Sequence, residues 1–124
     1  MPEDCEDIRW EGNKMRIAYI AHPFQGKRRN IRKVERIIKK LLPKYPDYVF
    51  YSPLHATGFY YHSVSYEQGM RHCFEFLNRA DELWLCEGWQ QSRGCNMEVR
   101  FARDNGIPIF EIVDGVVRCI PAGE

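Results

Sequence analysis

The stretch from Ala80 to Phe110 constrains the fold of this chain more than any other part of the sequence. Its apolar run at 83–86 is typical of a short buried strand, and residues 107–110 form a second such run. Between them, a turn rich in glycine and polar residues precedes apolar side chains at helical spacing: Cys95, Val99 and Ala102. Asn105-Gly106 is a C-terminal stop for that helix. The stretch therefore predicts a strand–loop–helix–strand unit.

The loop of this unit falls where open α/β sheets bind ligands, outside the carboxyl ends of the strands. Glu98 follows that loop, and we expect it in about the first turn of the helix. There the helix dipole would stabilise its carboxylate as the anion, which would be available as a nucleophile. The alternative is a surface residue that only complements the dipole, which is the commoner role of a glutamate at such a position.

Strand and helix patterns alternate along the rest of the chain. We expect further strands at 15–21, 48–51 and 116–120, a helix from the basic run 27–29 to Pro43, a long loop at 54–63, and a helix at 65–79. This order predicts an α/β fold, a flavodoxin-like or Rossmann-like three-layer sandwich with a mostly parallel five-stranded sheet. Residues 1–14 form a polar N-terminal lead-in, and residues 15–124 form a single domain.

The composition is that of an ordinary globular protein, with 44% apolar and 28% charged residues among 124. The net charge of +1 gives no whole-molecule field that favours nucleic acid. No apolar run approaches the ~20 residues of a membrane span, and the polar N-terminus lacks the apolar region of a signal peptide. We therefore expect neither nucleic acid nor a membrane as a partner.

The five cysteines show no Cys-x-x-Cys spacing, so they predict neither a disulfide framework nor a zinc site. Cys86 and Cys119 fall in expected strands and should be buried thiols. This usage favours a reducing, cytoplasmic compartment. We expect no metal ion and no cofactor.

The loops after the first three strands should meet at one edge of the sheet. They carry the candidate ligand-binding residues Tyr19, His22, Phe24, Ser52, His55, Tyr60, Tyr61, Glu87, Trp89, Gln90, Ser92, Gly94 and Glu98. Aromatic side chains there suit a flat ring, and a helix N-terminus suits an anion, although loop aromatics more often serve packing or interfaces. The basic run 27–29 could neutralise a phosphate or could be merely solvated. The sequence has no G-x-G-x-x-G or G-x-x-x-x-G-K-[ST] loop, so position alone predicts only a small-molecule binder.

One combination of motifs is more specific. The block Gly88-Trp89-Gln90-Gln91-Ser92-Arg93-Gly94-Cys95-Asn96-Met97-Glu98 occurs with Ile17-Ala18-Tyr19-Ile20-Ala21-His22-Pro23-Phe24, Arg29-Asn30-Ile31, Ser52-Pro53, Ala80-Asp81-Glu82-Leu83-Trp84-Leu85, Ala102 and Gly106-Ile107-Pro108. In these motifs the chain resembles the nucleoside 2-deoxyribosyltransferase-like superfamily, which includes 2′-deoxynucleoside 5′-monophosphate N-glycosidases. The resemblance covers most of residues 15–110.

The resemblance implies a flavodoxin-like fold and cleavage of an N-glycosidic bond. Glu98 would attack C1′ of the sugar and form a glycosyl ester, and Tyr19 would hold that carboxylate. Substrate-binding positions would be His22, Phe24, Arg28, Arg29, Asn30, Ser52, His55, Trp89, Ser92 and Gly94. The transferases carry an aspartate at the position of Ser92, which would repel a phosphate, whereas a hydroxyl can donate to one. We therefore expect a nucleoside 5′-monophosphate as the ligand.

The chain departs from the related hydrolases at Cys73, where they carry the acidic proton donor to the leaving base. A thiol is a poor replacement for a carboxylic acid, and His72 or Glu75, which could substitute, point away from Cys73 on a helix. The alternatives are therefore a non-catalytic nucleotide-binding module, or deoxyribosyl transfer between nucleosides. Related enzymes are oligomers, so we also expect at least a homodimer, with Phe59, Tyr60, Tyr61 and the helix 65–79 as the candidate interface.

Overall fold

The computed structural model describes residues 8–121, so residues 1–7 of the expected lead-in, Cys5 among them, and residues 122–124 lie outside it. The strands are β1 (Arg16–Ala21), β2 (Tyr48–Tyr51), β3 (Glu82–Leu85), β4 (Ile109–Val113) and β5 (Val116–Ile120). The α-helices are α1 (Arg28–Leu41), α2 (Pro53–Ala56), α3 (Tyr66–Leu77) and α4 (Arg93–Asp104), with 3₁₀ helices at Gly58–Ser63 and Trp89–Gln91. Within residues 8–121, no helix has both the length and the apolar character needed to cross a membrane.

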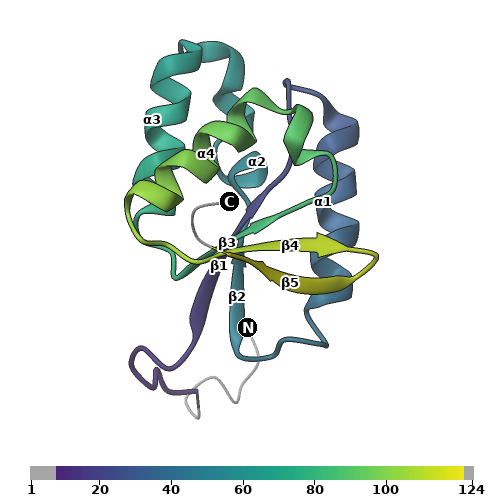
Figure 1. Cartoon of the computed structure of the whole chain (residues 1–124), viewed down its shortest axis with the longest axis vertical. Coiled ribbons are helices and arrows are strands. Elements are labelled where there is room, and N and C mark those ends of the chain that lie inside the picture. The colour runs from purple at the N-terminus through teal and green to yellow at the C-terminus, as the bar shows by residue number, and fades with distance from the viewer. Residues whose placement is uncertain (1–7, 122–124) are drawn as a thin grey trace.

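The five strands form one sheet in the order β2-β1-β3-β4-β5. β1, β2, β3 and β4 are parallel, and β5 pairs antiparallel with β4. Helix α1 lies on one face of the sheet, and α3 and α4 lie on the other (Figure 1). This is the predicted α/β three-layer sandwich, with the strand order of flavodoxin-like folds.

The chain changes direction across the sheet between β1 and β3. It leaves β1 toward β2 on one side, and it leaves β3 toward β4 on the other. The loops 22–27 and 86–92 therefore diverge at the carboxyl ends of these two neighbouring strands, where such sheets form a crevice. Gly88 adopts a left-handed φ of 90° in the second loop, a conformation that costs glycine little.

Successive side chains of β1 enter two separate cores, because side chains in a strand alternate between the faces of its sheet. On one face, Ala18 and Ile20 pack with Val34 and Leu41 of α1 and with Trp84 of β3. The core on this face holds α1 against the centre of the sheet.

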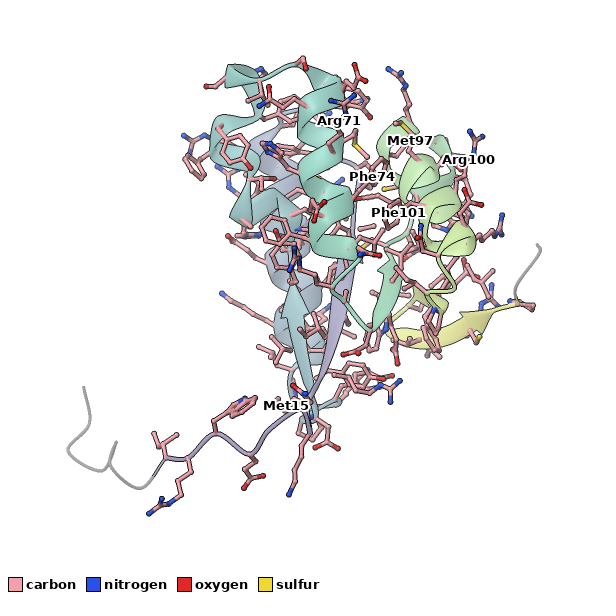
Figure 2. The ribbon with its side chains drawn as sticks, turned by 90° about the vertical axis from the view of Figure 1, so that its left-hand side faces the viewer. Met15, Arg71, Phe74, Met97, Arg100 and Phe101 are labelled. Carbon is pink, nitrogen blue, oxygen red and sulfur yellow. The ribbon has the colours of Figure 1, made fainter. Side chains whose placement is uncertain are left out.

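On the opposite face, Tyr19 packs with Leu77 of α3 and Val99 of α4. Phe74 of α3 stacks on Phe101 of α4 with 4.8 Å between the ring centroids, and Figure 2 shows the two side chains between these helices. This packing fixes α4 beside β1, so that the residue before Val99 faces the same core as Tyr19.

The expectation of a loop at 54–63 was wrong, because this segment forms α2 and a 3₁₀ helix. The hydroxyl of Ser52 accepts a hydrogen bond from the His55 N–H at 3.4 Å, and Pro53 occupies the first turn, where a proline needs no N–H. Helices of four and six residues are too short to show helical periodicity in a sequence.

Two smaller expectations also differ from the structure. β4 begins at Ile109 rather than at Ile107, because the Ile107 N–H still closes the end of α4 by donating to the Ala102 carbonyl at 2.9 Å. Cys119 is exposed rather than buried, because β5 is an edge strand. Cys86 is buried, as expected, just beyond the end of β3.

Candidate active site

An open cleft of about 1270 Å³ lies over the carboxyl ends of β1 and β3 and continues along one flank of α1. Its lining comes from the loop after β1, from α1, from residues 53–73, and from residues 86–98 with the β4–β5 turn. The volume exceeds the roughly 300–1,000 Å³ of typical small-molecule pockets. The cleft therefore occupies the crevice that the change of direction between β1 and β3 creates.

Glu98 lies in the wall of this cleft and is only 5% exposed. It is the sixth residue of α4, so it belongs to the second turn rather than the first. Burial raises the pKa of Glu98 to about 7, and the hydrogen bond that its Oε2 accepts from the Tyr19 hydroxyl lowers it. Both alternatives expected from the sequence were therefore wrong. Glu98 is not an exposed surface residue, and burial raises its pKa rather than stabilising the anion.

Tyr19 and Cys73 are neighbours of Glu98: Tyr19 lies behind it, and Cys73 lines the cleft. Tyr19 is fully buried, and burial, followed by the charges of Glu98 and Cys73, raises its pKa well above the usual value. Burial and the charge of Glu98 also raise the pKa of the Cys73 thiol to about 11. At neutral pH both groups are therefore protonated, and the carboxyl of Glu98 is the group of the three that ionises near pH 7.

The N-terminus of α4 forms the part of the cleft next to Glu98. Ser92 caps this helix, its Oγ accepting a hydrogen bond from the Cys95 N–H at 3.2 Å. The side chain of Asn96 donates to the Ser92 carbonyl at 2.8 Å and so fixes the preceding loop. The first N–H groups of a helix have no partner inside it, and together with the dipole they favour an anion.

Tyr66 covers this helix end. A Cβ added at Gly94 would lie 3.1 Å from the Tyr66 hydroxyl and 3.6 Å from the sulfur of Met70. The guanidinium of Arg93 lies 4.8 Å from the centroid of the Tyr66 ring. Gly94 therefore leaves room for Tyr66 to approach the start of α4.

The loop after β1 supplies the opposite wall. Asn30 is buried and donates from Nδ2 to the Phe24 carbonyl at 2.8 Å, which fixes the loop before α1. His22 lies at the carboxyl end of β1, and burial lowers its pKa, with the charge of Lys33 acting in the same direction. Phe24 packs edge-on against Tyr61, with 4.9 Å between the ring centroids.

Ten of the sequence-predicted site residues line the cleft: His22, Phe24, Arg29, Asn30, Tyr60, Tyr61, Glu87, Ser92, Gly94 and Glu98. Tyr19 lies behind Glu98 and reaches it through the hydrogen bond. The structure therefore gathers the candidate nucleophile, its tyrosine and the α4 N-terminus at one place.

Five other predicted residues do not line the cleft, and one of them, Gln90, is exposed in the loop before α4. Ser52 and His55 link α2 to α1: Ser52 Oγ lies 2.7 Å from His55 Nδ1, and His55 Nε2 lies 2.9 Å from Glu35. Trp89 lines a separate hollow, and its Nε1 lies 3.5 Å from a carboxylate oxygen of β4. Arg28, the first residue of α1, is exposed outside the cleft lining.

Tyr60 lines the cleft together with Glu98, and its hydroxyl lies 3.0 Å from Nδ1 of His72. The hydroxyl of Tyr51 is buried near Tyr60 and Cys73 and has no hydrogen-bond partner among the described residues. Burial, then the charges of Cys73 and Tyr60, raise the pKa of Tyr51. His72 thus reaches the cleft through Tyr60 rather than directly.

The lining residues that sequence reasoning missed include Lys33, Arg36, Lys40, Tyr66 and Met70. The three basic ones carry a signal that could have found them, because their spacing of three and four residues places them along one side of a helix. Tyr66 and Met70 carry none, since the position of α3 over α4 depends on packing between distant segments. Within residues 8–121, no group of three histidine, cysteine or acidic side chains could hold a metal ion.

Residues 17–111 match a family described as "Domain of unknown function (DUF4406)". The chain belongs to this family. The matched region runs from β1 into β4 and includes Tyr19, Ser92 and Glu98, so the centre of the cleft belongs to the DUF4406 domain. No curated protein matches the sequence significantly.

The fold of this DUF4406 chain is similar to that in the crystal structure of a conserved protein from Enterococcus faecalis V583. The TM-score is 0.67 at 18% sequence identity, over 81% of this chain and 65% of that one. At this identity the likeness shows the fold alone. The chain spans somewhat less than two thirds of the length of that protein.

Proposed function

We propose that this chain hydrolyses the N-glycosidic bond of a nucleoside or deoxynucleoside 5′-monophosphate through a covalent ester on Glu98. The observation that carries the proposal is a buried carboxyl group in the wall of the cleft, hydrogen-bonded to Tyr19, with a pKa of about 7. The motifs shared with the nucleoside 2-deoxyribosyltransferase-like superfamily support the same roles for both residues. Membership of that superfamily is part of the proposal.

The reaction has two steps. In the first, a Glu98 oxygen attacks C1′, the bond from C1′ to the base nitrogen breaks, and the base leaves with that electron pair and takes up one proton. In the second, water attacks C1′, the ester bond breaks, and a proton from the water returns to the group that protonated the base. The carboxylate is regenerated, and sugar 5-phosphate is released.

The hydrogen bond from Tyr19 orients the carboxylate and lowers its pKa toward the ionised form that attacks. The 5′-phosphate would lie at the N-terminus of α4, against Ser92 and the free N–H groups of the first turn. Arg29, which lines the same cleft, would balance its charge.

Protonation of the leaving base is the step at which this chain differs most from the related hydrolases, because Cys73 stands where they carry an acidic residue. With a pKa of about 11, the Cys73 thiol is a weak acid for this task. Tyr60 lines the cleft and its hydroxyl is hydrogen-bonded to His72. We infer that Tyr60 gives its proton to the leaving base and regains one through His72.

A second candidate function is nucleotide binding without catalysis, and the thiol at position 73 is the observation that favours it. Deoxyribosyl transfer between free nucleosides is less well supported, because Ser92 replaces the aspartate of the transferases. A homodimer in the cytoplasm, expected from the sequence, remains part of the proposal.

A panel of nucleoside and deoxynucleoside 5′-monophosphates tests the reaction, with free base measured by chromatography and the Glu98→Ala protein assayed beside the unaltered one. We expect base release that the substitution abolishes. Equal release by both proteins would contradict the role of Glu98. If no base appears and one nucleotide still raises the melting temperature, the non-catalytic binding module is the better account.

A further inference from the structure

Basic residues are concentrated in one segment of this nearly neutral chain. Residues 27–44, which contain α1, hold nine of the 18 lysines and arginines and a single acidic residue, Glu35. The segment therefore carries a net charge of +8, and the other residues carry −7, which gives the chain total of +1. A local positive field of this kind attracts anions even where the net charge does not.

Part of this charge forms a row that lines the same cleft as Glu98. Arg29, Lys33, Arg36 and Lys40 follow one another at intervals of four, three and four residues, which keeps them on one side of α1. At 1.5 Å per residue the row extends over about 16 Å. We call these four residues the basic row.

None of these four residues forms an ion pair within the part of the chain that the structure describes. Glu35, the acidic residue of the segment, pairs instead with His55 at 2.9 Å, away from the cleft lining. The row is therefore not neutralised by the acid on its own helix.

The cleft beside the row has an apolar floor and reaches the turn of the β4–β5 hairpin, where Asp114 and Gly115 line it. Ile37, Leu41 and Ile112 line it between α1 and β4. The tip of the β4–β5 hairpin lies against the C-terminal end of α1 (Figure 1), where Lys44 Nζ donates to the Gly115 carbonyl at 3.3 Å. The space therefore runs from Glu98 along the row and ends at the hairpin.

We propose that the ligand of this cleft continues beyond its sugar as a chain of phosphates bound along the basic row. The inference rests on the proposed function, because it takes the reacting nucleotide to lie at Glu98. A single phosphate at the α4 N-terminus would engage only Arg29 of the row, whereas phosphates spaced along the cleft would also meet Lys33, Arg36 and Lys40. A nucleoside triphosphate and a short single strand of nucleic acid share this chemistry.

Solvation of an ordinary helix surface is the competing explanation of the row. The chain offers a matched control, because Arg32 and Lys39 lie on α1, are exposed, and do not line the cleft. A protein with Arg36→Gln and Lys40→Gln loses one arginine and one lysine from the row. A protein with Arg32→Gln and Lys39→Gln loses the same charges from elsewhere on the helix.

The test measures equilibrium binding of three probes with the same 5′-terminal nucleotide: a nucleoside 5′-monophosphate, its 5′-triphosphate, and a 5′-phosphorylated trinucleotide. We expect at least one longer probe to bind roughly tenfold more tightly than the monophosphate. The R36Q/K40Q protein should lose this gain, and the R32Q/K39Q protein should keep it. A gain with the triphosphate alone identifies a nucleoside polyphosphate, and a gain with the trinucleotide alone identifies a strand.

Equal affinity for all three probes, or equal losses in the two double variants, would overturn the proposal. Base release from the monophosphate, with and without Glu98→Gln, is measured in parallel. If base release fails while the tighter binding of a longer probe still depends on the row, the proposed reaction is wrong and the phosphate site stands. If base release succeeds without such a gain, the reaction stands and the phosphate chain is wrong.

Discussion

Glu98 is destabilising in its ionised form, because its carboxyl group is buried. Its pKa is about 7 in the folded protein and 4.5 in the unfolded chain, so between these values the folded state holds a proton that the unfolded state has lost. The free energy of unfolding therefore falls as pH rises from 4.5 to 7, by a total of about 3 kcal/mol. A residue selected for stability alone would not carry this dependence.

Replacing Glu98 by glutamine should remove that dependence. The Glu98→Gln protein keeps a group that can accept from Tyr19 and has no proton to lose. We expect it to be more stable than the unaltered protein by up to about 3 kcal/mol at pH 8, and to show little difference at pH 4. Urea denaturation at both pH values measures this, and a gain that is the same at both would refute a titrating Glu98.

Tyr60 is the residue whose replacement tests the proton donor. Tyr60→Phe removes the hydroxyl next to His72 and leaves the ring in place. We expect kcat for base release to fall by about 10²-fold, in the range of general acid catalysis, with KM little changed. Tyr61→Phe is the control, because Tyr61 also lines the cleft and packs on Phe24. Similar losses in both variants would indicate a general effect on the cleft.

At the scale of elements, the N-terminus of α4 combines a structural role with the proposed phosphate site. The substitution Ser92→Asp separates the helix-capping role from the phosphate-binding role. Aspartate caps a helix as well as serine does, but its charge repels a phosphate. We expect the free energy of unfolding to change by less than about 0.5 kcal/mol, while KM for a 5′-monophosphate rises at least about tenfold. Ser92→Ala should instead cost about 1 kcal/mol of stability.

Steady-state kinetics and chemical denaturation on the same preparations decide this prediction. An unchanged KM in the Ser92→Asp protein would move the phosphate away from the α4 N-terminus. Turnover of a free nucleoside by the Ser92→Asp protein would instead agree with the resemblance, because the transferases carry an aspartate at this position and act on free nucleosides.

The elements differ in how far the sequence predicts them. The strands β1 and β3 and the helix α4 could be predicted, because apolar side chains recur at the spacing of each structure. α2 could not, because it contains only four residues. The hydrogen bond between Tyr19 and Glu98 was predicted from the family resemblance alone, because no local sequence pattern relates residues that are 79 positions apart. The burial that raises the pKa of Glu98 depends on how α3 and α4 pack, and no sequence pattern reports it.

At the scale of the whole molecule, exposed aromatic side chains are candidates for the interface of a homodimer. Phe59, in the 3₁₀ helix beside α2, is 86% exposed, and Tyr66 and Phe76 of α3 are also exposed. Exposed aromatic side chains are candidate contacts with a second copy of the chain. We expect a homodimer through this region, and sedimentation equilibrium should show Phe59→Ser weakening it. A strict monomer at micromolar concentration would contradict the expectation.

The central claim is a covalent bond between Glu98 and the sugar, and intact-protein mass spectrometry tests it most directly. A 2′-deoxy-2′-fluoro nucleoside 5′-monophosphate is the suitable probe, because fluorine destabilises the positively charged sugar in both steps and lets the ester accumulate. The account predicts a mass increase equal to the sugar phosphate, located on the peptide that contains Glu98 and absent from the Glu98→Gln protein. Release of base from the ordinary substrate, with no such adduct formed from the fluorinated one, would contradict it.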